Sequence, residues 1–235
     1  MMIKAYGKIN VALNILGKTD DGYHEIDTII LPVALHDSIE VVKLPSTYET
    51  FVTCDEFDLS EAHYNIVRAS IELLRKTYNF KDNFRVKIYK RIPIAGGLGG
   101  GSADAAAVMR AINRMLNLNA SDQELFELAK RLGTDVPFFV FNKGARCRGK
   151  GDDVSYLESY TKYNVLIIKP EKGLCTPDVY KEADSCTLVN TNIDMVVQAL
   201  EQGNDSLLAS SMSNALTLPA KKLLPELSDI ISEIK

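Results

Sequence analysis

The chain of 235 residues has few cysteines, few histidines and no pattern typical of a protein-held metal. Neither a C-x-x-C pair nor an H-E-x-x-H motif occurs, so we expect free thiols and no zinc site. Any metal is expected to arrive with a substrate. The residues concerned are widely scattered: Cys54, Cys147, Cys175, Cys186, His24, His36 and His63.

Long basic runs and long apolar runs are also missing. The net charge is −4, which argues against nucleic acid or an anionic membrane as the main partner and favours a small ligand. The N-terminal stretch "MMIKAYGKIN" is not a signal peptide, and no stretch approaches the roughly 18 apolar residues of a spanning helix. We therefore expect a cytoplasmic protein, monomeric or weakly dimeric.

Hydrophobic periodicity predicts an α+β fold. Alternating segments at Ile3–Ile15, Ser38–Leu44 and Phe84–Lys90 are typical of strands. Between them, the stretch from Glu61 to Asn79 has a helical apolar stripe that fits a helix lying on the sheet. The stripe consists of Ile66, Val67, Ser70, Ile71 and Leu74.

Two further helices are expected in the middle of the chain. One follows the glycines, with apolar residues at positions 109, 112, 115 and 116 and Ser102 as its N-cap. The other has the capping-box spacing of Ser121 and Glu124, and Gly133 suits its C-terminal cap.

Composition predicts a domain boundary near residue 155. Lys143–Asp153 is rich in glycine and charged residues, which predicts a turn or an interdomain linker. Tyr163–Pro170 has the pattern of a first strand of a second unit. We therefore expect domains at 1–155 and 156–235, the second with helices in "DMVVQALEQG" and "PELSDIISEIK".

The stretch "IPIAGGLGGGSADAAAVM" has five glycines in six positions directly before a helical pattern. A Walker A loop fits Gly96 and Gly101 but needs lysine where Ser102 stands, and a Rossmann fingerprint starting at Gly97 also ends in Ser102. The underlying chemistry remains, because a glycine loop before a helix N-terminus exposes backbone N–H groups that suit a polyphosphate. A flexible turn with a helix cap is the alternative.

Four ordered motifs make the chain resemble a known superfamily. "IPIAGGLGGGSADAA" resembles the central motif of the GHMP kinases (galactokinase, homoserine kinase, mevalonate kinase, phosphomevalonate kinase). "GKIN", "DGYHEIDTI" and "LGTDVPFF" are similar to signatures of the branch that phosphorylates 4-diphosphocytidyl-2-C-methyl-D-erythritol. The resemblance implies a two-domain fold, with a ribosomal-protein-S5-like N-terminal domain and a ferredoxin-like C-terminal domain that is incomplete here.

The resemblance implies phosphorylation of the substrate's 2-hydroxyl by ATP with Mg²⁺, in the non-mevalonate route to isoprenoids. By matching position, Lys8 and Asp135 would form the catalytic pair, which suits a reaction that needs a proton acceptor and a compensating cation. Taken alone, Lys8 could be a solvated edge charge and Asp135 a helix cap.

The remaining site residues also follow from the resemblance. Asn10 would bond the substrate, Tyr23 and His24 would bind cytidine, and Tyr180 would be the second aromatic residue, with a half-buried core tyrosine as the alternative. Ser102 would lie beside the phosphates and the metal ion. The expected ATP-binding residues are Pro93, Ile94, Ala95, Gly96, Gly97, Leu98, Gly99, Gly100, Gly101, Ser102 and Ala103.

Two departures from the family pattern stand out. Tyr6-Gly7 replaces the usual Pro-Ala before Lys8, and the sequence ends at Lys235 before a late G-x-G-P-T motif, although "SNALTLPA" resembles the segment that precedes it. We expect either a shortened form or a naturally truncated relative with low or absent activity. The alternatives are a non-catalytic nucleotide-binding protein and a GHMP kinase for another small alcohol such as homoserine or mevalonate.

Overall fold

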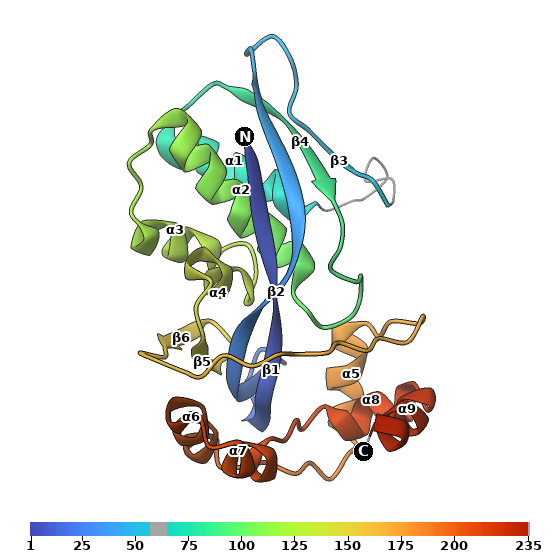
Figure 1. Ribbon diagram of the computed structural model, residues 1–235. Coiled ribbons are helices and arrows are strands. Elements are labelled where there is room, and N and C mark those ends of the chain that lie inside the picture. Colours follow the sequence, from blue (N-terminus) through green and yellow to red (C-terminus); the bar gives the residue numbers. More distant parts are fainter. Residues whose placement is uncertain (57–64, 235) are drawn as a thin grey trace. The chain divides into compact units, whose positions relative to one another are not determined.

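A computed structural model describes residues 1–56 and 65–234 (Figure 1). The chain divides into two compact units that interleave in sequence. The first unit comprises Met1–Gly7, Pro32–Pro93 and Leu98–Lys143, and the second comprises Lys8–Leu31, Ile94–Gly97 and Gly144–Lys235. The predicted family domains, 1–155 and 156–235, remain a prediction.

The sheet of the first unit is built on alternating strands. In β2 (His24–Leu44), the second half pairs antiparallel with β4 (Asn83–Tyr89), and β3 (Phe51–Cys54) runs parallel to β4. Because side chains alternate between faces, every second residue is buried. The buried set is Ile39, Val41, Phe84, Val86 and Ile88.

The described residues of the first unit also form four helices. They are α1 (Ile66–Tyr78), α2 (Gly100–Leu116), α3 (Asp122–Ala129) and α4 (Val136–Phe141). The helix α1 packs against α2 and buries the predicted stripe except Ile66, which is half-buried, with Asn65 capping its first turn. The capping box at the start of α3 is confirmed. His63 and residues 61–64 of the predicted helix lie outside the described residues.

The second unit is centred on the first half of β2. This half pairs antiparallel with β5 (Ala145–Gly149), which continues into a hairpin with β6 (Asp153–Tyr156). The long strand β1 (Met2–Lys18) also pairs with β2. The predicted turn at Lys143–Asp153 is therefore wrong in part, because Ala145–Gly149 within it forms the strand β5, along which Arg146 and Arg148 alternate with buried residues.

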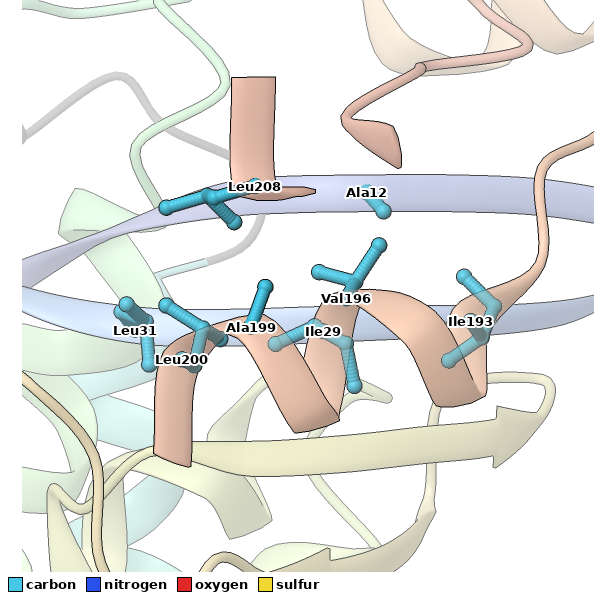
Figure 2. Close-up of a cluster of buried hydrophobic side chains, with 8 residues drawn as sticks. All are labelled: Ala12, Ile29, Leu31, Ile193, Val196, Ala199, Leu200 and Leu208. Carbon is cyan, nitrogen blue, oxygen red and sulfur yellow. The ribbon is translucent and has the colours of Figure 1, made fainter. Parts of the chain in front are cut away.

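Helices α6 (Ile193–Gln202) and α7 (Asp205–Ser211) supply the core of the second unit. Figure 2 shows their apolar side chains directed at those of β1 and β2. Helices α5 (Thr176–Ala183), α8 (Thr217–Leu223) and α9 (Glu226–Ile234) complete the unit. The cluster in Figure 2 comprises Ala12, Ile29, Leu31, Ile193, Val196, Ala199, Leu200 and Leu208.

Three local expectations are corrected. Tyr163–Pro170 forms no strand, and Leu166 is 83% exposed, because a strand needs a backbone partner as well as a favourable sequence. Ser102 is the third residue of α2, whose N-cap is Gly99. Gly133 is not a C-cap, because α3 already ends at Ala129. No helix in the described part of the chain is long and apolar enough to cross a membrane.

Candidate functional site

The glycine segment folds as a turn that leads directly into α2. Gly97 and Gly99 have φ values of 71° and 70°, a left-handed conformation that glycine adopts without a steric cost. Ala95 also has a positive φ of 53°. Two of the five glycines are therefore required by backbone geometry, and the segment leaves the first N–H groups of α2 without side-chain caps.

Gly100 is favoured for a different reason, which is space. A Cβ atom there would lie 3.0 Å from Nζ of Lys90 and 3.2 Å from Cγ2 of Ile92. At Gly101, by contrast, the nearest contact would be Cγ2 of Ile66 at 3.8 Å. The backbone at the start of α2 thus rests on the Lys90 side chain.

Lys90 joins two carboxylates in a buried cluster, the Lys90 cluster. Its Nζ lies 2.5 Å from Oδ2 of Asp37 and 3.0 Å from Oδ2 of Asp104, and the side chains are 6%, 0% and 4% exposed. The second oxygen of Asp37 accepts hydrogen bonds from the backbone N–H groups of Arg91 and Ile92. The cluster therefore ties β2 and β4 to the first turn of α2.

Burial sets the protonation of this cluster. Burial raises the pKa of Asp104 to about 7, an effect that Lys90 partly offsets and Asp37 reinforces. Burial lowers the pKa of Lys90, but the two carboxylates outweigh it, so the pKa lies above its ordinary value. In the described part of the chain Oδ1 of Asp104 has no hydrogen-bond partner.

The second unit holds the other end of the turn. A Cβ atom on Gly173 would lie 2.5 Å from Cβ and 2.9 Å from the carbonyl oxygen of Ala95. Only glycine at position 173 allows this close approach, so Gly173 fixes the position of Ile94–Gly97 within this unit.

Ser102 is the residue predicted to lie beside a metal ion that the phosphates carry. The described residues contain no group of three or more histidine, cysteine, aspartate or glutamate residues that could hold a metal. Ser102 is half-buried in the first turn of α2, where a hydroxyl is close to the N–H groups that would bind phosphate. A hydroxyl at this position is compatible with the role predicted for Ser102 beside phosphates and a metal ion, which stays a prediction.

Lys8 and Asn10 lie on one face of β1, two residues apart. Nζ of Lys8, a residue only 8% exposed, donates to Oδ1 of Asn10 at 2.7 Å, and Nδ2 of Asn10 donates to Oγ1 of Thr28 at 2.8 Å. Lys8 is therefore a buried ammonium group bonded to a neutral amide, which contradicts its interpretation as a solvated edge charge.

Asp135 precedes α4 in the first unit. Although it occupies the N-cap position, its side chain makes no capping hydrogen bond, and the residue is half-buried. Asp135 therefore holds the N-cap position that the alternative interpretation gave it, but without a capping hydrogen bond from its side chain. Its carboxylate is left available for another role.

His24 lies between an acidic and an aromatic side chain in the second unit. Nε2 of His24 is 2.7 Å from Oδ1 of Asp184, and the His24 and Tyr180 rings are 5.0 Å apart at 31°. Tyr23 is 57% exposed, with Nζ of Lys150 4.8 Å from its ring centre. Tyr180 packs against Leu13, Ile15 and their neighbours at the edge of a core cluster, as the alternative interpretation expected, while its ring also lies beside His24.

The structure places the predicted residues as follows. Lys8, Asn10, Tyr23, His24, Tyr180 and Ile94–Gly97 belong to the second unit, and Pro93, Leu98–Ala103 and Asp135 belong to the first. The Lys90 cluster, Gly173 and Asp184 were not predicted from the sequence as part of the site. Lys90 and Asp37 continue the buried alternation of their strands, a signal that was available; the sequence offers no such signal for Gly173 or Asp184.

Comparison with known proteins identifies the family. Residues 65–143 match the family model of the GHMP kinases N terminal domain. A 4-diphosphocytidyl-2-C-methyl-D-erythritol kinase of Caldicellulosiruptor saccharolyticus is 40% identical over 217 residues, which cover 92% of this chain and 74% of that protein. A kinase of the same name from Clostridium botulinum strain Eklund 17B is 34% identical over 236 residues, which cover 99% of this chain and 84% of that protein.

Solved structures agree with the sequence comparison. A crystal structure of 4-(cytidine 5'-diphospho)-2C-methyl-D-erythritol kinase matches with a TM-score of 0.75 and 28% identity, covering 98% of this chain and 81% of that one. The phosphomevalonate kinase of Streptococcus pneumoniae matches with a TM-score of 0.60 and 14% identity, covering 94% and 78%, which supports the fold alone. The predicted GHMP kinase fold is confirmed. The chain belongs to the 4-diphosphocytidyl-2-C-methyl-D-erythritol kinase family of the GHMP kinases and is an ATP-dependent kinase.

Proposed function

We propose that this kinase transfers the γ-phosphoryl group of ATP to the 2-hydroxyl of 4-diphosphocytidyl-2-C-methyl-D-erythritol, giving the 2-phosphate and ADP. The observation that carries the proposal is the 40% identity to a kinase of that name over 92% of this chain. The reaction would belong to the non-mevalonate synthesis of isoprenoid precursors.

Asp135 and Lys8 are the proposed catalytic pair. Asp135 accepts the proton of the 2-hydroxyl as its oxygen bonds to the γ-phosphorus and the bond to the ADP oxygen breaks. Lys8 places a positive charge near the charge that develops. Its hydrogen bond to Asn10 fixes the ammonium group, and Asn10 keeps hydrogen-bonding capacity for the substrate.

The segment from Pro93 to Ala103 is the proposed ATP-phosphate loop. Its support is the left-handed backbone at Gly97 and Gly99 and the uncapped N–H groups at the start of α2. Mg²⁺ bound to the phosphates would neutralise their charge during transfer. Ser102 is the residue whose hydroxyl would approach the metal ion and the phosphates.

His24, Tyr23 and Tyr180 are the proposed cytidine-binding residues. An aromatic face can stack on a pyrimidine for about 1–3 kcal/mol, and an imidazole can bond to its polar edge. The paired rings of His24 and Tyr180 support this choice. A kinase for homoserine or mevalonate has no base to recognise, so this pair favours the cytidyl substrate.

The test measures ADP release by the 235-residue chain with the cytidyl substrate, homoserine and mevalonate. We expect turnover with the first substrate alone, at about 1 s⁻¹ or faster if the chain is fully active. Asp135→Asn should abolish turnover while ATP binding persists, and Asp122→Asn in α3 serves as the control.

Three outcomes would contradict parts of this proposal. Normal turnover by the Asp135→Asn variant would remove the assigned base. Binding of ATP and cytidine diphosphate without turnover would identify a non-catalytic relative. Turnover with homoserine or mevalonate, and no binding of cytidine diphosphate, would assign the chain to another small alcohol.

A further inference from the structure

Asp184 contacts the side chain that is proposed to read the pyrimidine. It follows α5 in the second unit, and its Oδ1 lies 2.7 Å from Nε2 of His24, from which it is 160 residues distant in sequence. The His24 side chain is 10% exposed. His24 is therefore held with one ring nitrogen against a carboxylate.

Lys18 fixes the other side of the same carboxylate. Its Nζ donates to Oδ2 of Asp184 at 2.6 Å. The hydrogen bonds from Lys18 and then from His24 hold the pKa of Asp184 below its usual range. Asp184 is thus ionised at neutral pH and can only accept hydrogen bonds.

An accepting carboxylate determines the tautomer of a neutral histidine. Because Asp184 cannot donate, the hydrogen atom of the imidazole must be on Nε2, and Nδ1 is left as an acceptor. Among the residues that the structure describes, none bonds to Nδ1 of His24. This nitrogen is the free polar atom of the ring.

We propose that Asp184 is a positioning residue that makes the enzyme select cytidine over uridine, by holding His24 in the tautomer whose Nδ1 accepts a hydrogen bond. Cytosine has a 4-amino group that donates to such an acceptor, whereas uracil has a 4-oxo group that would oppose it. The inference rests on the proposed function, because it needs His24 to face the base.

Asp184→Asn is the most informative variant, because the position of Lys18 determines the orientation of the new amide group. The Lys18 ammonium keeps the amide oxygen on its own side, so the amide NH₂ faces His24 and donates to Nε2. The hydrogen atom of His24 then moves to Nδ1, which becomes a donor. Asp184→Ala removes the acceptor that keeps the hydrogen atom of His24 on Nε2, without supplying a donor that would move it to Nδ1.

The experiment measures binding of cytidine diphosphate and uridine diphosphate by calorimetry. We expect the wild-type chain to prefer cytidine diphosphate by ~10-fold or more, since a mismatched pair loses a hydrogen bond and leaves polar groups unsatisfied. Asp184→Ala should reduce the preference to about threefold or less, and Asp184→Asn should abolish or reverse it. Asp178→Asn, an exposed aspartate in α5, should behave as wild type.

¹⁵N resonances of the His24 ring separate positioning from general loss of structure. They should show the hydrogen atom on Nε2 in the wild-type chain and on Nδ1 in Asp184→Asn. An unchanged cytidine preference in both Asp184 variants would overturn the role of Asp184 while leaving the proposed function intact. Failure of the wild-type chain to bind either diphosphate would overturn both.

Discussion

Three ionisable side chains lie almost completely buried at the start of α2, directly after the proposed ATP-phosphate loop. A buried ion pair is costly to desolvate, and removing one partner leaves an uncompensated charge. Lys90 meets two carboxylates, and the raised pKa of Asp104 reduces the excess negative charge of the cluster. Below about pH 7 the Lys90 cluster therefore holds a proton that the carboxyl of the unfolded chain, with its ordinary pKa of 3.8, has already released.

Asp104 should consequently make the protein less stable as the pH rises. Its carboxyl has an ordinary pKa of 3.8 in the unfolded chain and about 7 in the folded chain. Below the lower pKa the Asp104 carboxyl is protonated in both states, and its contribution to the free energy of unfolding is fully present. Between the two pKa values only the folded state keeps the proton. The free energy of unfolding therefore falls through this window, by at most about 1.4 kcal/mol per pH unit.

Asp104→Asn should remove this part of the pH dependence. Urea unfolding at pH 4.5 and pH 7.5 measures the difference for the wild-type chain, for this variant and for Asp122→Asn, an exposed control. We expect a smaller difference in Asp104→Asn and a wild-type difference in the control. An equal pH dependence in all three proteins would contradict a raised pKa of Asp104.

At the scale of elements, adjacent glycines of α2 should tolerate substitution differently. Gly100→Ala would bring a methyl group within 3.0 Å of Nζ of Lys90, whereas Gly101→Ala meets nothing closer than 3.8 Å. We expect Gly100→Ala to reduce the free energy of unfolding by about 1–3 kcal/mol through overpacking. Gly101→Ala should change it by less than about 1 kcal/mol, in the stabilising direction.

Urea titration of the two alanine variants gives the comparison directly. Both changes remove one glycine from the same helix turn, so differences in unfolded-state entropy cancel. Equal stabilities would mean that Lys90 moves aside without cost.

The close approach of Gly173 to Ala95 gives a second prediction at this scale. Gly173→Ala cannot be accommodated without displacing Ile94–Gly97, because the added Cβ would lie 2.5 Å from Cβ of Ala95. A displaced phosphate loop should raise the KM for ATP ~10-fold or more, since small misplacements of binding groups are costly. Gly17→Ala, with nothing within 4 Å of the added atom, is the control.

Steady-state kinetics at varied ATP concentration tests this prediction. Circular dichroism establishes that the Gly173→Ala variant is folded. An unchanged KM for ATP in the folded variant would show that the Ile94–Gly97 turn does not determine nucleotide binding.

These elements also show which parts of the structure can be predicted from the sequence alone. Period-two alternation and capping signals are local, so β4, α1 and the capping box of α3 were predictable, as was the glycine loop. Contacts between distant residues were not: His24 and Asp184 are 160 residues apart, and Lys90 and Asp37 are 53 apart. Tyr163–Pro170 has the composition of a strand, but composition cannot supply a pairing partner.

At the scale of the whole molecule, β1 and β2 each contribute residues to both compact units. The proposed catalytic Lys8 follows Gly7 on β1, so the boundary between units falls within a continuous strand. Each unit also has its own core, with α1 and α2 serving the first and α6 and α7 the second. Binding residues in each unit can therefore be altered without removing the core of the other.

The Tyr163–Ile168 segment should make the whole molecule prone to self-association. Val165, Leu166 and Ile168 are 49%, 83% and 50% exposed in a run that forms no helix or strand within the described chain. Such a run offers backbone and apolar groups to another chain. Leu166→Lys should therefore lower the aggregated fraction in light scattering, while the unfolding midpoint stays unchanged because the side chain is already exposed. Leu218→Lys on α8, 46% exposed, makes the same change in net charge; an equal reduction by that control would attribute the effect to charge and not to this segment.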